Sequence, residues 1–281
     1  MKVLVTGAGG QVGRDVVEIC VAAGDDVVAA GRSELDVTVR SDVAAVVAAT
    51  RPEVVIHCAA WTAVDDCEGD PDRAFAVNAD AVRWVREASE LVGAHLLTLS
   101  TDYVFDGTLD RPYHERDTPN PRSVYGRSKL AGEVEAGPDA TVVRTSWVCG
   151  PHGSNIVRTV LRLAAEQDTL AFVVDQRGCP TFTSDLAPML RRLAVERRAG
   201  IHHVTNQGAV SWYEFACSIV SAIGKDPAMV RPIRTADLVP PRPAERPANG
   251  VLDNMVLRDA GLPLLRDHRD ALADLVARLS A

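Results

Sequence analysis

Short apolar runs alternate with longer stretches of helical periodicity through the first half of the chain. Five runs have the length and the β-branched character of buried strands. These runs are Lys2–Val5, Val27–Ala30, Glu53–His57, His95–Leu99 and Thr141–Arg144. The longest helical segment between them extends from about Pro71 to Val92. Strands that alternate with helices predict a parallel sheet with helices on both faces, which is a doubly wound α/β fold.

The alternation loosens after about residue 150. Prolines gather between Pro232 and Pro247, and the last expected helix extends from about Asp267 to Leu279. We therefore predict a doubly wound domain over residues 1–150 and a smaller C-terminal lobe over residues 151–281, interleaved with the sheet.

A glycine-rich turn follows the first expected strand, in Thr6-Gly7-Ala8-Gly9-Gly10-Gln11-Val12-Gly13. A turn between a strand and a helix is typical of a dinucleotide-binding fingerprint in a Rossmann-like domain. Gly7 permits the tight turn, Gly10 lets the backbone approach a diphosphate, and Gly13 lets the helix pack on the strand. The N-terminus of the helix then faces the phosphates. We expect cofactor contacts from Gly7, Gly10, Gln11, Val12 and Gly13.

Tyr125 and Lys129 lie four residues apart in Ser123-Val124-Tyr125-Gly126-Arg127-Ser128-Lys129, so they share a face of a helix. An ammonium beside a phenol favours the phenolate and lowers the pKa of the phenol. Tyrosine then becomes a usable general acid near neutral pH. By itself the pair is also compatible with a solvated helix face. Combined with the dinucleotide turn, it predicts chemistry on a carbonyl or an alcohol.

The net charge of −8 argues against a nucleic-acid partner, because binding nucleic acid requires a basic surface. No apolar stretch is long enough to span a bilayer. The chain enters its first strand at Lys2 without a recognisable targeting segment. Six cysteines without a Cys-x-x-Cys pair favour free thiols in a reducing compartment. We expect a cytoplasmic protein without a membrane partner, either a monomer or a homodimer.

This combination is similar to the extended short-chain dehydrogenase/reductase superfamily and, within it, to the dTDP-4-dehydrorhamnose reductase family. Two segments specific to this family carry the resemblance, Ser100-Thr101-Asp102-Tyr103-Val104-Phe105-Asp106-Gly107 and Asp175-Gln176-Arg177-Gly178-Cys179-Pro180-Thr181. Further matching segments are Val124-Tyr125-Gly126, Lys129-Leu130-Ala131-Gly132-Glu133, Arg144-Thr145-Ser146-Trp147-Val148 and Arg246-Pro247. The chain departs from the family at Cys149, where tyrosine is usual, and at Gly250, where serine is usual.

The resemblance implies reduction of the C4 ketone of a sugar of the dTDP-4-dehydro-L-rhamnose type, with NADPH as the cofactor and some tolerance for NADH. It implies that Tyr125 delivers the proton, that Lys129 lowers the tyrosine pKa and holds the nicotinamide ribose, and that Thr101 polarises the carbonyl. A hydroxyl that caps a turn at the end of a strand is the alternative for Thr101. Two other functions stay open: a 4-ketoreductase for another nucleotide deoxysugar, and a non-catalytic NADP-binding regulatory subunit.

Further cofactor contacts are expected after the second and third strands. In this fold an acid after the second strand binds the ribose of NAD, whereas an arginine accommodates the 2′-phosphate of NADP. The chain has Arg32-Ser33 at this point, and Ser33 can donate to the phosphate. Glu34 opposes this contact through charge repulsion. By resemblance, Asp36 and Val37 contact the adenosine, and Ala59 and Ala60 contact the pyrophosphate.

The expected substrate contacts rest on the resemblance alone, and they are Asp102, Trp147 and Arg246. Trp147 offers a flat face to the sugar, or else it is a core aromatic. Arg246 forks onto the diphosphate, or else it is a solvated charge in a proline-rich loop.

The remaining acidic residues are not predicted to hold a metal. Asp65, Asp66 and Glu68 follow the third strand, where we expect a solvated turn. Some members of the family bind magnesium through acidic residues, and Asp15 matches one such position. Ser184 stands where another acid is expected, so we predict no metal site.

Overall fold

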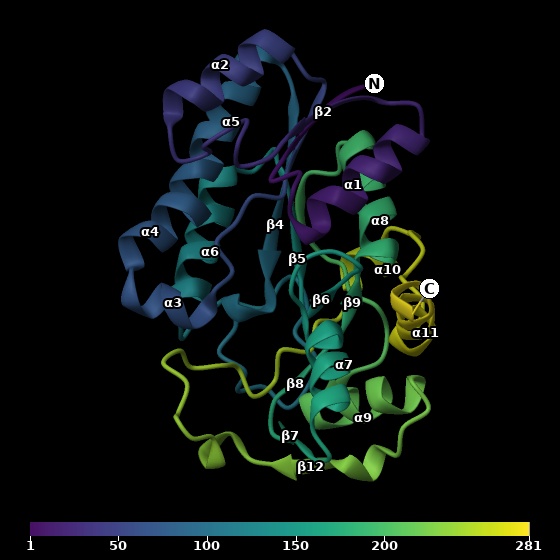
Figure 1. Ribbon diagram of the computed structural model, residues 1–281. Helices are drawn as coiled ribbons and strands as arrows, with labels where there is room; N and C mark the ends of the chain where they lie inside the picture. Colours follow the sequence, from purple (N-terminus) through teal and green to yellow (C-terminus); the bar gives the residue numbers. More distant parts are fainter. Residues whose placement is uncertain (281) are drawn as a thin grey trace.

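A six-stranded sheet organises the computed structural model, which describes residues 1–280 (Figure 1). The strand order is β10-β5-β4-β3-β1-β2, and every neighbouring pair is parallel. The strands are β1 (Lys2–Thr6), β2 (Asp26–Ala30), β3 (Val54–His57), β4 (His95–Thr101), β5 (Thr141–Thr145) and β10 (Gly200–His203). The structure confirms the predicted doubly wound fold. All strands therefore end at one edge of the sheet, where ligands bind in this fold.

Helices cover both faces of the sheet (Figure 1). On one face lie α2 (Arg40–Thr50), α5 (Ala81–Val92) and α6 (Val124–Ala136), with the shorter α3 (Val64–Gly69) and α4 (Pro71–Phe75) beside them. On the other face lie α1 (Gln11–Ala22) and α8 (Thr183–Val195), which pack against each other. A π-helical turn, η1 (Ala76–Asp80), joins α4 to α5. The predicted helix from Pro71 to Val92 is thus one helical segment with a π turn inside it.

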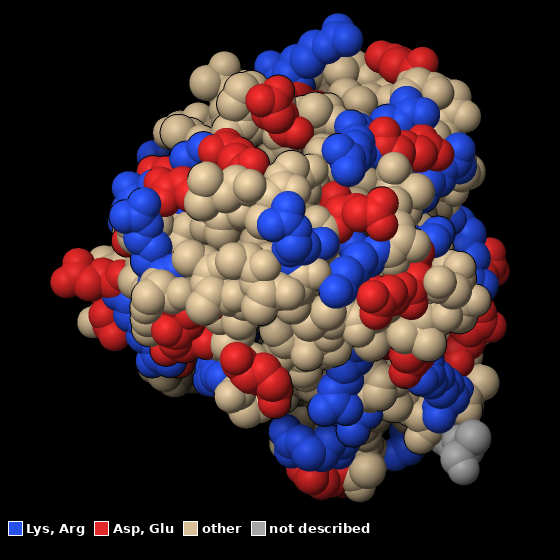
Figure 2. Space-filling view, turned by 90° about the horizontal axis from the view of Figure 1, so that it is seen from above, with Lys and Arg blue, Asp and Glu red and all other residues tan. Residues whose placement is uncertain are grey.

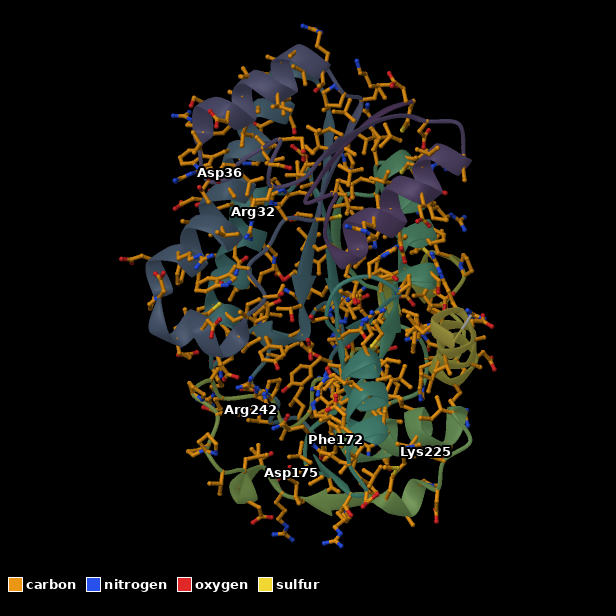
Figure 3. The ribbon with its side chains drawn as sticks, viewed as in Figure 1. Arg32, Asp36, Phe172, Asp175, Lys225 and Arg242 are labelled. Atoms are coloured by element: carbon orange, nitrogen blue, oxygen red, sulfur yellow. The ribbon has the colours of Figure 1, made fainter. Side chains whose placement is uncertain are left out.

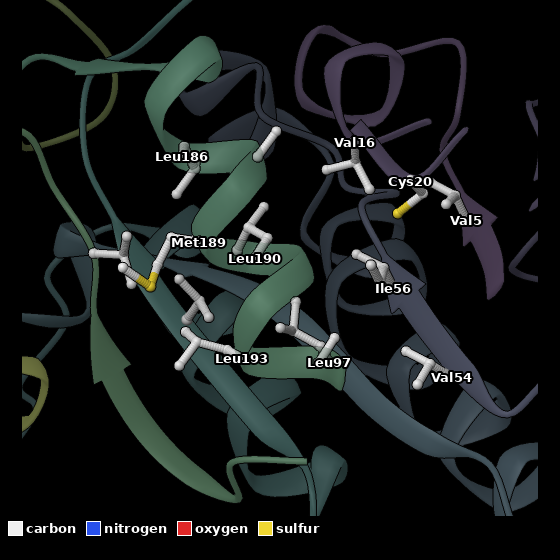
Figure 4. Packing of buried hydrophobic residues seen from close by; sticks show 14 of the residues in the cluster. Val5, Val16, Cys20, Val54, Ile56, Leu97, Leu186, Met189, Leu190 and Leu193 are labelled. Carbon is white, nitrogen blue, oxygen red and sulfur yellow. The ribbon is translucent and has the colours of Figure 1, made fainter. Parts of the chain in front are cut away.

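Apolar side chains from α8 interlock with α1 and the central strands (Figure 4). Leu186, Leu190 and Leu193 of α8 are fully buried. They belong to the same cluster as Val16 of α1 and Ile56 of β3. A second cluster holds α2 and α5 to the opposite face. Because α8 follows residue 150 in the chain, the C-terminal half completes the core of the N-terminal sheet.

The rest of the C-terminal half forms a smaller lobe around three short strand pairs. These pairs are β7 (Leu170–Val173) with β12 (Val230–Ile233), β6 (Val148–Cys149) with β9 (Thr181–Phe182), and β8 (Arg177–Gly178) with β11 (Val210–Ser211). The lobe helices are α7 (Ile156–Glu166), α9 (Trp212–Ala222) and α11 (His268–Ser280), whereas α10 (Met255–Asp259) packs against β10 and adds Leu257 to the core of the sheet. The remaining turns are η2 (Asp102–Val104), η3 (Pro227–Met229) and η4 (Thr235–Asp237). We retain the division into residues 1–150 and 151–281 as a proposal, with β10 and α8 as the interleaved elements.

Charged side chains of both signs are interspersed over the face shown in Figure 2. Within residues 1–280, none of the helices combines the length and the apolar character that crossing a bilayer requires. All six cysteines are free.

Candidate active site

The predicted site residues come from successive strands and meet along the carboxyl edge of the sheet. Gly7 follows β1, Arg32 follows β2 and Ala59 follows β3. Thr101 is the last residue of β4, and Trp147 comes shortly after β5. Figure 3 shows Arg32 and Asp36 near α2, while Arg242 and Asp175 lie lower in the molecule. The residues expected to bind the cofactor and the residues of the C-terminal lobe thus lie at different heights in this view.

The glycine turn has the geometry that a diphosphate site needs. Gly7 adopts a positive φ of 65°, and its carbonyl accepts from the N–H of Gly10 at 2.9 Å. A Cβ on Gly13 would overlap the Gly7 carbonyl oxygen. The turn is therefore as close to the helix as glycine allows. It leaves the first-turn N–H groups of α1 available to an anion.

The side chains of Gln11 and Val12 are engaged within the protein, so only their backbones are left for the expected cofactor contacts. The Gln11 amide donates to the Val148 carbonyl at 3.0 Å and accepts from Asn155 at 2.7 Å. Val12 packs against the core. The Gln11 side chain therefore ties the nucleotide turn to the C-terminal lobe, a link that the motif alone does not reveal.

The end of β3 lies directly against this turn. A Cβ on Gly7 would come within 2.5 Å of the Ala59 nitrogen. Asn78, in the π turn η1, accepts from the N–H of Trp61 at 2.9 Å and donates to the Trp61 carbonyl at 3.1 Å. It also donates to Ser128 of α6 at 3.0 Å. Asn78 is fully buried and was not predicted. The π turn that contains Asn78 points to a functional role, because such turns often occur at functional sites. This turn is visible in the structure but not in the sequence.

The loop after β2 is exposed and carries opposing charges. Arg32 is exposed and, over residues 1–280, forms no hydrogen bond or ion pair. Glu34 accepts from the N–H of Gly31 at 2.9 Å and from the Ser33 hydroxyl at 2.5 Å. The Ser33 bond is the main reason why the pKa of Glu34 is lowered. Ser33 thus already donates its proton to Glu34, while the Arg32 guanidinium is free to meet a phosphate.

The adenosine contacts expected after this loop differ in character. Asp36 is exposed, and its carboxylate accepts from the N–H and the hydroxyl of Thr38 at 3.0 and 2.6 Å. These bonds lower the pKa of Asp36. The side chain of Val37 is buried in the core. Val37 can therefore contact a cofactor only through its backbone.

Helix α6 presents Tyr125, Lys129 and Glu133 toward the end of β4. Ser123 caps the helix by accepting from the N–H of Gly126 at 3.0 Å. The three residues are spaced by four, so they share one face, and all three are buried. Lys129 Nζ donates to the Leu99 carbonyl of β4 at 2.7 Å. The predicted Tyr–Lys pair is therefore placed against the sheet rather than on a solvated face.

The pKa shifts of this pair differ from the expected ones. Burial raises the pKa of Tyr125, although a hydrogen bond with Thr101 acts in the opposite direction. Burial also lowers the pKa of Lys129 to about 8, against the raising effect of Glu133. Lys129 is not among the groups that shift the pKa of Tyr125, and desolvation is the largest cause for both side chains. The lowering of the tyrosine pKa by Lys129 stays a prediction.

Thr101 lies between Tyr125 and Asp102. Its hydroxyl accepts from the N–H of Tyr103 at 3.2 Å, which caps the η2 turn. The same hydroxyl donates to Asp102 Oδ1 at 3.0 Å. Asp102 is 2% exposed, and burial raises its pKa to about 7. Thr101 is thus both a turn cap and a neighbour of the tyrosine hydroxyl. Capping the turn is therefore compatible with the expected role of polarising a carbonyl.

Trp147 is one of a stacked pair of indoles. Its ring lies 3.5 Å from that of Trp212, with an angle of 8° between the planes. A Cβ on Gly178 would come within 2.5 Å of the Trp147 ring. The Trp147 backbone has a positive φ of 46°, which is unusual for a bulky residue. Trp147 is half-buried, and Trp212 was not predicted because nothing in its local sequence indicates the stack.

Arg246 reaches from the proline-rich loop (residues 238–248) to α3. Its guanidinium forms a two-pronged ion pair with Asp65, with N···O distances of 2.5 and 2.6 Å. The Arg246 side chain is 10% exposed, which excludes a solvated charge. The expected solvated turn for Asp65, Asp66 and Glu68 is also wrong. These residues form α3, where Asp65 binds Arg246 and Glu68 accepts from the N–H of Val124 at 2.7 Å.

Asp15 and Glu18 of α1 form a separate polar cluster with His152, which lies in the loop after β6. His152 Nε2 lies 3.7 Å from Asp15 and 3.9 Å from Glu18. All three ligand atoms lie within 4.8 Å of one another. His152 was not predicted, because it joins Asp15 only through the fold. An imidazole beside two carboxylates is not the all-oxygen set that magnesium prefers.

Together these residues can bind a dinucleotide and transfer a proton beside it. The α1 N-terminus and the Gly7–Gly13 turn fit a diphosphate, and Arg32 fits a ribose phosphate. Tyr125, Thr101 and Lys129 converge at the end of β4, where Tyr125 is the group that can exchange a proton with a carbonyl or alcohol oxygen.

Comparison with known proteins agrees with this chemistry. The family model of the RmlD substrate binding domain matches residues 1–281. A dTDP-4-dehydrorhamnose reductase from Streptomyces griseus is 46% identical over 280 residues, covering 96% of this chain and 91% of that protein. A probable dTDP-4,6-dihydroxy-2-methyloxan-3-one 4-ketoreductase from Streptomyces antibioticus is 44% identical over 281 residues, with 98% and 94% covered.

A solved structure of similar sequence has the same fold. The dTDP-4-dehydrorhamnose reductase of Bacillus anthracis, in complex with NADP, superimposes with a TM-score of 0.94. It is 37% identical, and the match covers 99% of both chains. The smaller lobe and the nucleotide-binding sheet of this chain are therefore both present in that protein.

Proposed function

Because the chain belongs to the dTDP-4-dehydrorhamnose reductase family, we propose that it reduces the C4 ketone of dTDP-4-dehydro-L-rhamnose to dTDP-L-rhamnose with NADPH. The observation that carries this proposal is the convergence of Thr101, Tyr125 and Lys129 at the end of β4, beside a dinucleotide turn. The family is one of NAD(P)H-dependent dTDP-sugar 4-ketoreductases, so a carbonyl substrate is what this group of residues would meet.

NADPH, when bound, supplies the hydride that C4 accepts. Tyr125 donates a proton to the carbonyl oxygen as the alcohol forms, and its buried position keeps this proton available at neutral pH. Lys129 is held at the end of β4 by the Leu99 carbonyl, where it binds the cofactor ribose. Thr101 donates a hydrogen bond to the developing oxyanion, a direct form of transition-state stabilisation.

The proposed substrate contacts come from residues at the C-terminal lobe. The Trp147 face that is turned away from Trp212 packs on the sugar, and Arg246 binds the diphosphate with the guanidinium that Asp65 orients. Arg242 lies 3.7 Å from the same carboxylate. Two arginines around one acid leave a positive charge for a nucleotide diphosphate.

A second candidate is a 4-ketoreductase for a different dTDP-deoxysugar. The 44% identity to the Streptomyces antibioticus protein favours it, as do Cys149 and Gly250, which depart from the family pattern. A non-catalytic regulatory subunit is disfavoured, because Thr101, Tyr125 and Lys129 are all present and close together.

The assay incubates the purified protein with NADPH and dTDP-4-dehydrorhamnose and follows cofactor absorbance. Formation of dTDP-L-rhamnose, identified by chromatography against a standard, supports the proposal. If NADPH is consumed only with another dTDP-4-keto-6-deoxysugar, the second candidate is correct. If no ketosugar is reduced, the reductase proposal fails.

We expect NADPH to be preferred over NADH, and Arg32→Ala to remove most of this preference. A hydrogen bond to a charged group contributes about 1.5–3 kcal/mol, so the ratio of kcat/KM values should fall by roughly ten- to a hundredfold. Glu34→Gln should act in the opposite direction, because it removes a negative charge that also holds Ser33. The measurement is kcat/KM for both cofactors in each variant.

Arg40→Ala is the matched control for this experiment. Arg40 is an exposed arginine of α2 that pairs with Glu87, so its removal should leave the cofactor preference unchanged. Equal kcat/KM for NADPH and NADH in the wild type, or a preference that survives Arg32→Ala, would show that Arg32 does not bind the 2′-phosphate.

Activity should survive an excess of EDTA. Among residues 1–280, the group with the spacing of metal ligands is Asp15–Glu18–His152, on α1 and the loop after β6, and it includes none of Thr101, Tyr125 and Lys129. The test compares kcat before and after dialysis against EDTA, with added magnesium as the second arm. Full loss that magnesium restores would contradict the prediction and place a required metal in this protein.

A further inference from the structure

Thr101 has one hydroxyl proton, but the proposed reaction offers it two acceptors, which are the Asp102 carboxylate and the substrate carbonyl oxygen. In the structure the Thr101 hydroxyl donates to Asp102 Oδ1 and accepts from the N–H of Tyr103. A hydroxyl has one donor and two acceptor sites. Thr101 therefore cannot donate to a substrate carbonyl while it donates to Asp102.

Asp102 is placed where an ionised carboxylate is poorly stabilised. It is 2% exposed, and over the described part of the chain its Oδ2 atom is buried without a hydrogen-bond partner. Gly250 lies against this oxygen so closely that a Cβ there would overlap it. Glycine also brings no hydroxyl that could donate to the oxygen. A buried charge with one oxygen left unpaired is costly, so this environment favours the protonated acid.

The groups around Asp102 do not offset this cost. The titratable side chains that face it are neutral near pH 7, and they are Tyr103 in its own segment, Tyr125 on α6 and Cys179 after β8. The arginines of the two adjoining segments are paired elsewhere, Arg177 with Glu214 and Arg246 with Asp65. Proton binding by Asp102 is therefore governed by burial, which raises its pKa and outweighs the hydrogen bonds from Thr101 and from the backbone of Asp102 and Tyr103.

We propose that Asp102 is a positioning residue whose protonation sets the direction in which Thr101 donates its proton. This inference rests on the proposed reductase function. Ionised Asp102 accepts the Thr101 proton and withdraws it from the substrate. Protonated Asp102 donates its own proton to Thr101 Oγ1, and Thr101 then donates to the carbonyl oxygen.

In this arrangement the hydroxyl of Tyr125 leaves its hydrogen bond with Thr101 and donates to the substrate oxygen instead. Every hydrogen-bonding site of the Thr101 hydroxyl is then used. Oγ1 accepts from Asp102 and from the N–H of Tyr103, and its O–H points to the substrate. No proton is transferred to the product by this route, because Tyr125 supplies the proton that the alcohol keeps. The form with protonated Asp102 is thus the one that stabilises the oxyanion.

The wild-type kcat should therefore fall as the pH rises through about 7, where the raised pKa of Asp102 lies. The protonated form is active, so activity is full below this pKa and is lost above it. Loss of one oxyanion donor lowers kcat by about a hundredfold at full ionisation. In Asp102→Asn the fall in kcat near pH 7 should disappear, because an amide does not titrate. A separate fall in kcat near pH 8, where Lys129 loses its proton, should remain in this variant.

A double-mutant cycle separates positioning from direct substrate binding. Thr101→Val keeps the shape of the side chain and removes the hydroxyl. If Asp102 acts through Thr101, Asp102→Asn changes kcat and its pH profile in the wild type but not in the Thr101→Val background. An equal effect in both backgrounds overturns the proposal, and so does a fall near pH 7 that persists in Asp102→Asn. Asp110→Asn, which removes an exposed carboxylate in the same segment, is the control and should keep the wild-type profile.

Infrared difference spectra of the protein alone give a readout that does not depend on turnover. The wild type should show a protonated carboxyl band that is lost as the pH rises through about 7. This band should be absent from Asp102→Asn and shifted in Thr101→Val. If the wild type lacks the band, the proposal fails even where the enzyme reduces the ketosugar. If the band behaves as expected but no ketosugar is reduced, only the reductase function fails.

Discussion

Tyr125→Phe is expected to lower kcat by about two to four orders of magnitude, the usual scale for losing a general acid. The substitution removes one hydroxyl and keeps the ring, which packs edge-on against Tyr103 with 5.5 Å between the centroids. Because the fold and the dinucleotide turn stay intact, the Kd for NADPH should hardly change. Steady-state kinetics by NADPH absorbance and cofactor titration by fluorescence measure the two quantities.

Tyr213→Phe is the matched control for this substitution. Tyr213 is half-buried on α9 in the C-terminal lobe, so it loses the same group outside the proposed site and should keep wild-type kinetics. Near wild-type turnover in Tyr125→Phe would show that another group supplies the proton. A large rise in Kd for NADPH would show instead that the tyrosine mainly binds the cofactor.

The sheet and the nucleotide turn could be predicted because their signals are local. The signals are the strand that ends before Gly7, the start of the helix that contains Gly13, and the spacing of Tyr125 and Lys129. Each is contained in a few consecutive residues. The parallel order of the strands then follows from their alternation with helices. This is why the edge that gathers Thr101, Tyr125 and Lys129 could be predicted from the sequence.

The contacts that complete the site join residues far apart in the chain. Asp65 and Arg246 are 181 residues apart, and neither segment shows a pattern that depends on the other. The stack of Trp147 on Trp212 and the bonds from Asn78 to Trp61 and Ser128 depend equally on tertiary packing. Long-range pairs of this kind were therefore missed or assigned to solvent.

Spacing also fails to predict burial, and burial decides the charge states. The four-residue spacing of Tyr125 and Lys129 suggests a favourable pair of charges. In the structure both side chains are almost completely desolvated, which favours the neutral form of each. The same effect acts on Asp102. The sequence could not show it, since the burial of Asp102 depends on Gly250, far along the chain.

One turn or two further along the face of α6 that carries Tyr125 and Lys129, a buried ion pair joins the helix to β5. Arg144 is 1% exposed and donates to both oxygens of Glu133, at 2.8 and 2.6 Å. The Ser100 hydroxyl of β4 donates to the same carboxylate at 2.5 Å. Glu133 follows Tyr125 and Lys129 on the same face, so this pair sets the position of the helix against the strands that end in the site.

Arg144→Met is expected to lower the free energy of unfolding by about 3–5 kcal/mol, because it leaves the Glu133 carboxylate buried without its cation. Urea denaturation, followed by circular dichroism, measures the loss. The control is the double variant Glu133→Leu with Arg144→Met, in which two apolar side chains replace the pair; it should be much closer to the wild type. If Arg144→Met is as stable as the wild type at neutral pH, or if the double variant is less stable than the single one, the ion pair does not hold α6 on the sheet.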